Sequence, residues 1–109
     1  MADKIPFEDF IKLDCRVGRI VEAEMVPDAK KLVKLKIDIG GTMKQSIAGL
    51  GEHYRPEDLR SKLVAVITNL QPRKIFGQES EVMLLAALDA NVVSLLRPDR
   101  DVSAGSKIT

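Results

Sequence analysis

The sequence predicts an all-β fold, a five-stranded barrel formed by a single domain over residues 1–109. Period-two alternation of apolar and polar residues is the dominant pattern after the first dozen residues, and it is typical of half-buried strands. A Gly-Gly pair separates two alternating runs, as in a tight hairpin. The clearest internal helix signature, a proline followed by acids, is long enough for only a turn or two.

Three strands are predicted in the first half of the chain. Residues 15–25 read as one long strand, and Gly18 within it is expected to mark a bulge or a sharp bend where the strand crosses between two sheets. Residues 33–39 alternate aliphatic with charged residues, which indicates a half-buried strand with a charged outer face. Gly40-Gly41 supplies the hairpin turn, and residues 42–48 return as the third strand.

The second half continues the pattern with shorter elements. Residues 55–60 predict a short helix with proline in its first turn, and residues 62–69 predict the fourth strand. Residues 82–88 are apolar on both faces, which suits either a central strand or one covered by a partner, and residues 92–96 form a last short strand.

Residues 6–13 favour another short helix at the N-terminus. Its apolar side chains are expected to pack over one end of the barrel: Phe7, Phe10 and Ile11.

The predicted order is a long bent strand, a hairpin, a short helix, a strand, a long loop and a strand. This connectivity is that of the OB-fold, a five-stranded Greek-key barrel that binds oligonucleotides or oligosaccharides through its loops and one sheet face.

Charge is nearly balanced overall but unevenly placed. A net charge of +1 argues against a polybasic, histone-like binder. Five lysines nevertheless lie in the predicted hairpin region: Lys30, Lys31, Lys34, Lys36 and Lys44. Arg73 and Lys74 form a second basic group in the long loop. If the two groups meet in space they form a basic patch, whereas the strand lysines alone are equally compatible with a solvated face.

The composition limits the cellular locations and the kinds of catalytic or metal site that are expected. A single cysteine allows no internal disulfide, the N-terminus lacks a secretory pattern and the longest apolar runs are far too short for a membrane span, so a cytoplasmic location is expected. One histidine leaves little for a metal site or a Ser-His-Asp arrangement. No acid, base and nucleophile set is visible, so neither catalysis nor a cofactor or metal is expected.

The loop over residues 69–80 carries the chemistry most suited to nucleic acid. Arg73 can bind a phosphate with a bidentate fork, and Lys74 adds a point charge. Asn69 and Ser80 stand at the two stems, where each can donate to and accept from a base edge or a ribose hydroxyl. Considered alone, the segment is equally a solvated basic turn.

The chain resembles the tRNA-binding OB domain family. That domain occurs as an appendage or separate subunit of methionyl-tRNA synthetases, as free-standing tRNA-binding dimers and in CsaA-type export chaperones. The resemblance covers nearly the whole chain and rests on these segments: Asp9-Phe10, Asp14 to Ile20, Ala29-Lys30-Lys31-Leu32, Lys36 to Gly40, Asn69 to Lys74 with Gly77 and Ser80, Met83 to Ala87, Leu95 to Asp99 and Gly105 to Ile108.

The resemblance implies a set of RNA-contacting residues: Lys31, Asn69, Arg73, Lys74, Ser80 and Met83. The binding surface is expected to extend to Lys34, Lys36, Lys44 and Phe76, although Phe76 is equally suited to anchor the loop on the barrel. The chain departs from the usual family pattern at Val26, where a histidine is common, at Lys30 and at Val82. The sequences of the segments Ser80 to Val82 and Lys44 to Ser46 are closer to those of CsaA-type members.

With only three phenylalanines and one tyrosine, the chain has few platforms for stacking single-stranded bases, so recognition of a folded RNA by its backbone is favoured. The prediction is a non-catalytic tRNA-binding protein that acts as a homodimer paired through its terminal segments. Two alternatives stay open, an export chaperone that holds unfolded clients and the tRNA-binding β-subunit of a split methionyl-tRNA synthetase.

Overall fold

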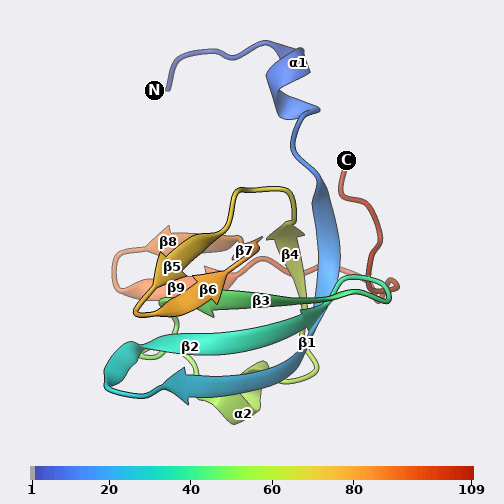
Figure 1. Ribbon diagram of the computed structural model, residues 1–109. Coiled ribbons are helices and arrows are strands. Elements are labelled where there is room, and N and C mark those ends of the chain that lie inside the picture. Colours follow the sequence, from blue (N-terminus) through green and yellow to red (C-terminus); the bar gives the residue numbers. More distant parts are fainter. Residues whose placement is uncertain (1) are drawn as a thin grey trace.

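The computed structural model describes residues 2–109, and its backbone is mostly β-structure (Figure 1). The elements in chain order are α1 (Phe7–Phe10), β1 (Cys15–Val26), β2 (Ala29–Asp38), β3 (Met43–Ala48), α2 (Pro56–Leu59), β4 (Leu63–Ile67), β5 (Arg73–Ile75), β6 (Gln78–Ser80), β7 (Met83–Leu84), β8 (Ala86–Asp89) and β9 (Val92–Leu95). Both short helices and all the predicted strands but the one at residues 82–88 are therefore present, with shifts of a few residues at their ends.

One strongly curved antiparallel sheet carries the fold, in the order β3-β2-β1-β4-β7, and the pairs β5-β6 and β8-β9 form separate hairpins. Within residues 2–109 no ladder pairs the two outer strands of the sheet, β3 and β7. The hairpin β5-β6 lies against β3 at this seam. The seam is the place where a site can form, because side chains rather than a continuous ladder connect its two sides.

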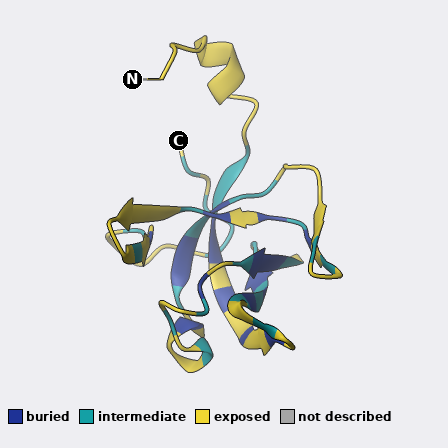
Figure 2. Ribbon diagram, turned by 90° about the vertical axis from the view of Figure 1, so that its left-hand side faces the viewer, coloured by how far each residue is buried: buried dark blue, intermediate teal, exposed yellow. Residues whose placement is uncertain are grey.

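The core follows from the alternation in the sequence. Val33, Leu35 and Ile37 on β2 are fully buried, whereas the residues between them carry lysine side chains to the outer face. Ile20 on β1 and Val64 on β4 complete the centre of the same cluster. Figure 2 shows this buried centre surrounded by exposed hairpins and turns.

Gly18 does not mark a bulge, although β1 passes from pairing with β4 to pairing with β2 directly after it. Its pairing with Val64 on β4 is regular, and the register shifts in β1 lie further on, between Ile20 and Glu22 and between Met25 and Val26. The glycine is needed for close packing instead, because a Cβ atom there would lie 2.5 Å from Cγ2 of Ile37. The prediction of a bulge at Gly18 was therefore wrong in position and in cause.

Residues 82–88 do not form one central strand. The segment divides at Leu85 into β7, which pairs with β4, and β8, which turns away to pair with β9. As a result Met83 is 50% exposed and Leu88 is 77% exposed. Burial on both faces within a single copy of the chain was therefore a wrong expectation.

The N-terminal helix forms but does not cover the barrel. In Figures 1 and 2, α1 stands apart from the sheet at the end of an extended connection. Phe7 is 71% exposed, and Phe10 and Ile11 are exposed as well. Four residues without a side-chain cap give the helix little stability of its own. No helix in residues 2–109 has the length and apolar character needed to cross a membrane.

Candidate nucleic-acid interface

The loop predicted at residues 69–80 contains a short, ordered hairpin. Arg73 pairs with Ser80 and Lys74 with Glu79 across the β5-β6 ladder. Phe76 and Gly77 form the turn with φ of 53° and 77°, the left-handed conformation that a two-residue hairpin turn requires. The basic pair is therefore held on a strand, and Phe76 is 59% exposed at the tip.

A polar clip attaches this hairpin to β3. Glu81 N donates to Gln45 O at 2.8 Å, and Gln45 N donates to the Glu81 carboxylate at 2.9 Å. The Gln45 side chain adds two bonds, because its amide donates to Glu79 O at 2.9 Å and accepts from Lys36 Nζ at 2.8 Å. The Glu81 carboxylate therefore accepts the hydrogen bond that Gln45 N would otherwise donate to a neighbouring strand at the open seam.

The clip makes a stability prediction. Gln45→Ala removes both side-chain bonds, each with a net value of about 1 kcal/mol, and is expected to loosen the hairpin while the five-stranded sheet stays intact. Hydrogen exchange of the amides over residues 73–80 is the measurement, and faster exchange confined to them is the expected result. Gln78→Ala in the same hairpin is the control, since the Gln78 side chain makes no hydrogen bond within residues 2–109. Equal protection in both variants would show that the Gln45 side chain does not hold the hairpin.

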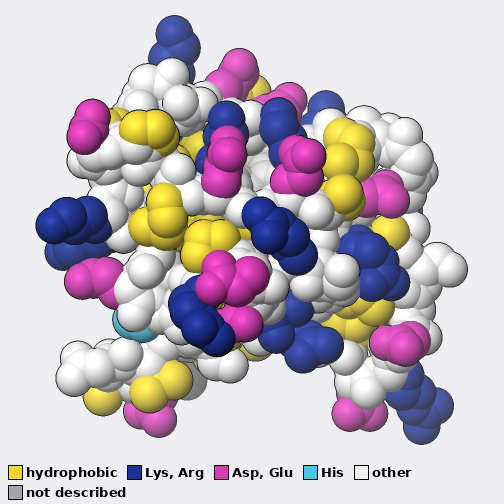
Figure 3. All heavy atoms as spheres, turned by 90° about the horizontal axis from the view of Figure 1, so that it is seen from below, with side chains coloured by type: hydrophobic (Ala, Val, Ile, Leu, Met, Phe, Trp, Pro, Cys, Tyr) yellow, Lys and Arg dark blue, Asp and Glu magenta, His cyan; other side chains and the backbone are white. Residues whose placement is uncertain are grey.

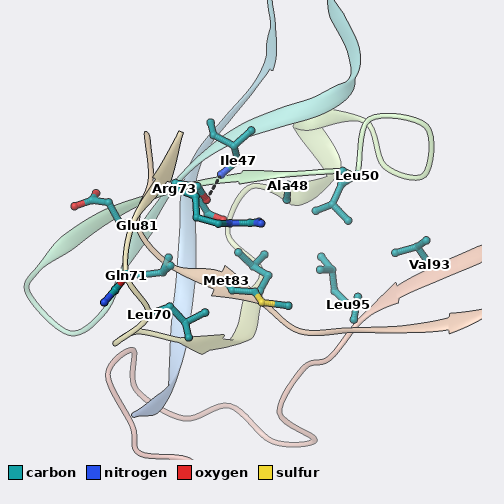
Figure 4. Close-up of a pocket in the computed structure, with 16 residues that line it drawn as sticks. Ile47, Ala48, Leu50, Leu70, Gln71, Arg73, Glu81, Met83, Val93 and Leu95 are labelled. Atoms are coloured by element: carbon teal, nitrogen blue, oxygen red, sulfur yellow. Dashed lines mark hydrogen bonds between the residues drawn. The ribbon is translucent and has the colours of Figure 1, made fainter. Parts of the chain in front are cut away.

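A groove of about 630 Å³ lies beside the hairpin at the seam between β3 and β7. Three of the predicted site residues line it, namely Arg73, Ser80 and Met83. Figure 4 shows Arg73 extending into the groove, with Met83 on the neighbouring wall. Ser80 is buried, and its hydroxyl oxygen accepts from Ile47 N at 3.1 Å. Leucine and valine side chains form most of the floor: Leu50, Val82, Leu84, Val93 and Leu95.

Charge sets Arg73 and Lys74 apart from the other predicted cations. Neither side chain forms a hydrogen bond or an ion pair within residues 2–109. The four strand lysines of the predicted binding surface have partners: Lys31 with Glu52 at 3.9 Å, Lys34 with Glu24 at 3.2 Å, Lys36 with Gln45 at 2.8 Å and Lys44 with Glu81 at 3.9 Å. The hairpin therefore presents two uncommitted positive charges.

The outer face of β1 and β2 has a different character. Figure 3, which views the molecule from that side, shows basic and acidic side chains interspersed. Glu22 and Glu24 on β1 surround a shallow depression together with Lys34 and Lys36 on β2. Arg60 lines the same depression, so Lys34 and Lys36 belong to a face of mixed charge rather than to a continuous basic patch.

Asn69 is engaged within the fold. Its side-chain oxygen accepts from Asp14 N at 2.8 Å, and its amide nitrogen donates to Lys12 O at 2.6 Å. These bonds fasten the start of β1 to the end of β4, and Asn69 does not line the groove. Lys31 also lies outside the groove, so the structure gathers Arg73, Ser80 and Met83 but not Asn69 or Lys31.

The same junction lowers the pKa of Asp14. The Thr68 hydroxyl donates to the Asp14 carboxylate and is the largest cause, and the Arg16 guanidinium adds a hydrogen bond at 2.9 Å and its charge. Both interactions favour the ionised carboxylate, so the pKa falls below its ordinary value of 3.8. The stabilisation is therefore complete above the ordinary pKa and is lost as pH falls through the lowered one.

Thr68→Val is accordingly expected to raise the pKa of Asp14 and to make stability depend less on pH in acid. A carboxyl NMR titration measures this directly, with Asp99 in the exposed tail as the reference carboxylate. An unchanged Asp14 titration would mean that the Thr68 hydroxyl does not hold the carboxylate.

Sequence reasoning missed the polar clip and part of the groove. Gln45 and Glu81 were noted only for their resemblance to one subfamily, and their contact joins positions 36 residues apart. Gln71 also lines the groove, and its place beside the basic pair was the one local signal that could have indicated it.

Comparison with known proteins agrees with this arrangement. Residues 15–107 match the protein family described as "Putative tRNA binding domain". Methionine–tRNA ligases of Pyrococcus furiosus and Thermotoga maritima are each 45% identical, over 95% and 96% of this chain. The chain spans only 14% and 17% of the length of those two enzymes.

Solved structures resemble this chain over nearly its whole length and over their own full length. A MetRS-related protein from Pyrococcus horikoshii has a TM-score of 0.92 at 29% identity, covering 99% of this chain and all of that one. The chaperone CsaA from Bacillus anthracis has a TM-score of 0.89 at 37% identity, covering 98% of this chain and all of its own. These matches confirm the predicted OB-fold, and the chain belongs to the tRNA-binding OB domain family.

Proposed function

We propose that this protein is a non-catalytic tRNA-binding protein of the cytoplasm that grips folded tRNA with the β5-β6 hairpin. The observation that carries the proposal is the pair Arg73 and Lys74, uncommitted within the described chain and held on an ordered ladder beside the groove. A guanidinium fork and an ammonium can each bind a phosphate, and because successive side chains of a strand point to opposite faces, Arg73 serves the groove side of the hairpin and Lys74 the other side. The extension of the contact to Lys31, Lys34, Lys36 and Lys44 is secondary, because each has a partner to release first.

The distribution of aromatic residues favours a folded RNA over a single strand. Phe7 and Phe10 lie on the distant α1 helix, where their rings contact each other. The Tyr54 hydroxyl accepts from Leu95 N at 3.1 Å, which fixes the tyrosine against β9. Phe76 alone is exposed near the basic pair, so a row of stacking platforms is missing from the described residues.

The test compares labelled total tRNA with an unstructured RNA of equal length across a salt series. Tighter binding of tRNA at every salt concentration, with affinity falling linearly on a logarithmic scale, is the expected result. Equal affinity for both RNAs would reject recognition of a folded shape. Absence of binding to either RNA would reject the function itself.

The terminal segments support pairing of two copies. Five apolar side chains are exposed on and around α1: Ile5, Phe7, Phe10, Ile11 and Leu13. Leu88 and Val92 are exposed on the β8-β9 hairpin. Burial of such surface drives association, and the family resemblance implies pairing through the terminal segments. A homodimer would carry two basic hairpins on one particle, which suits a bulky ligand such as tRNA.

A second candidate function is that of a chaperone. The apolar floor of the groove and the likeness to CsaA favour it, since exposed apolar surface can hold an unfolded segment. The test is suppression of the aggregation of an unfolded model protein, with and without tRNA. Suppression that tRNA does not compete would separate this activity from RNA binding.

A partnership with a methionyl-tRNA synthetase is the remaining alternative. The matched ligases contain this domain as a small part of a longer chain, so a free copy could supply the same function to a separate catalytic chain. Capture of a methionyl-tRNA synthetase on the immobilised protein, retained after ribonuclease treatment, would support it. Loss of the synthetase after that treatment would show that tRNA merely bridges the two proteins.

A further inference from the structure

We propose that the groove at the β3-β7 seam holds one unstacked nucleobase of the bound tRNA, with the adjoining phosphates on the basic hairpin. This inference rests on the proposed tRNA-binding function and assigns a part of the ligand to a specific cavity. The groove is of the size expected for a small-molecule site and is large enough for a single base.

The groove offers apolar side chains that can pack against the face of a base and polar side chains that can form hydrogen bonds with its edge. Leu50, Leu84 and Leu95 give a buried apolar floor against which a flat ring can pack. The Ser80 hydroxyl accepts from Ile47 N, so its own proton is available to donate to an acceptor on the ring. Gln71 adds an amide that can both donate and accept.

Arg73 and Met83 supply the stacking surfaces that the aromatic residues do not. The Arg73 guanidinium is planar and stacks on aromatic faces, and it extends into the groove without a partner among residues 2–109 (Figure 4). Met83 is half exposed on the adjoining wall, and its polarisable thioether packs well on rings. A base entering the groove would contact both.

Charge favours a base over an apolar peptide segment as the occupant. The one carboxylate of the lining, Glu81, accepts from Gln45 N and lies 3.9 Å from Lys44 Nζ. Arg73 therefore gives the mouth of the groove a net positive character. A nucleotide brings a flat apolar ring and a phosphate together, which matches an apolar floor with a positive rim. An apolar peptide has no charge to pair with Arg73.

Two neighbouring alanines provide a matched test. Ala86 lines the groove, whereas Ala87 does not, and both are exposed on β8. Ala86→Phe fills the groove without touching any charge and is expected to weaken tRNA binding by about tenfold, with an unchanged salt slope. Ala87→Phe is expected to bind as the wild type does. Arg73→Lys retains the charge but lacks the plane, and it should also lose affinity at an unchanged slope.

Methionine methyl NMR gives a readout that does not depend on a variant. A base stacked on Met83 is expected to move its methyl resonance upfield by ring current when total tRNA is added to the wild type. Met25 on β1 and Met43 on β3 lie outside the groove and serve as internal references.

The outcomes separate this inference from the function on which it rests. If the wild type does not bind tRNA, the function fails. If it binds while the Met83 methyl stays unmoved and Ala86→Phe binds equally well, the base site is wrong and the backbone grip stands. If Ala86→Phe keeps tRNA affinity but no longer suppresses aggregation of an unfolded model protein, the occupant is a peptide and the base assignment is overturned.

Discussion

Replacing Arg73 and Lys74 together by alanine is expected to weaken tRNA binding by on the order of 100-fold at moderate salt. A hydrogen bond to a charged group contributes about 1.5 kcal/mol or more, and about 1.4 kcal/mol corresponds to tenfold in affinity. Neither side chain forms a hydrogen bond or an ion pair within residues 2–109, so their removal breaks no polar interaction there and should leave the stability of the fold nearly unchanged.

The salt dependence of tRNA binding gives a second, more specific expected result for the Arg73/Lys74 double variant. Each phosphate contact contributes roughly 0.7 to 0.9 to the slope of log affinity against log salt, so the double variant should lose about 1.5 units of slope. Arg97→Ala with Arg100→Ala is the charge-matched control, since both arginines are exposed in the C-terminal tail and outside the groove. Equal losses in the two double variants would mean that only net charge matters. Unchanged affinity after loss of the hairpin pair would place the site elsewhere.

Replacing Phe7 and Phe10 together by serine is expected to convert the proposed dimer into a monomer. Both rings lie on α1, which contributes no buried side chain to the fold of a single copy. Their loss should therefore leave the thermal midpoint of the monomer fold intact while it removes apolar surface from the pairing region. Light scattering at micromolar concentration should report half the mass of the wild type.

Separation of the copies should also weaken tRNA binding by tenfold or more, because a second hairpin is no longer held near the same ligand. For the mass measurement alone, Phe76→Ser is the control, since that ring is also exposed but lies on the hairpin tip, away from α1. It should remain dimeric. A wild type that scatters as a monomer, or a Phe7/Phe10 variant with the mass of the wild type, would contradict pairing through the terminal segments.

The sequence predicted the strands well where a local pattern determines them. The alternation over β2 places Val33, Leu35 and Ile37 inside, and the Gly-Gly pair ends the strand, so neither feature depends on distant residues. Pro56 and the acids after it likewise give α2 in place. Each of these features is determined by residues that lie within a few positions of one another in the sequence.

Features that depend on tertiary contact were not predictable in the same way. An apolar stripe on α1 indicates that its rings need cover but does not say whether the barrel or another chain supplies it. The bulge expected at Gly18 is absent, because a glycine in a strand is compatible with a bulge and with close packing alike. The division of residues 82–88 into β7 and β8 is set by two different pairing partners, which an apolar run does not reveal.

Only part of the candidate site was predicted, because its other part also depends on tertiary contacts. The motif around residues 69–74 identified the family, yet an amide in a loop can contact a ligand or fasten two strands, and Asn69 fastens β1 to β4. The groove could not be predicted, because it exists only where β3 and β7 fail to pair.

Lysine acetylation footprinting with and without saturating tRNA tests the central claim most directly. Lys74 is expected to lose most of its reactivity when tRNA is bound, while Lys62, which directly precedes β4 and lies outside the groove, keeps its own. Full reactivity of Lys74 in the complex, with protection on the mixed face around Lys34, would contradict a tRNA site on the hairpin.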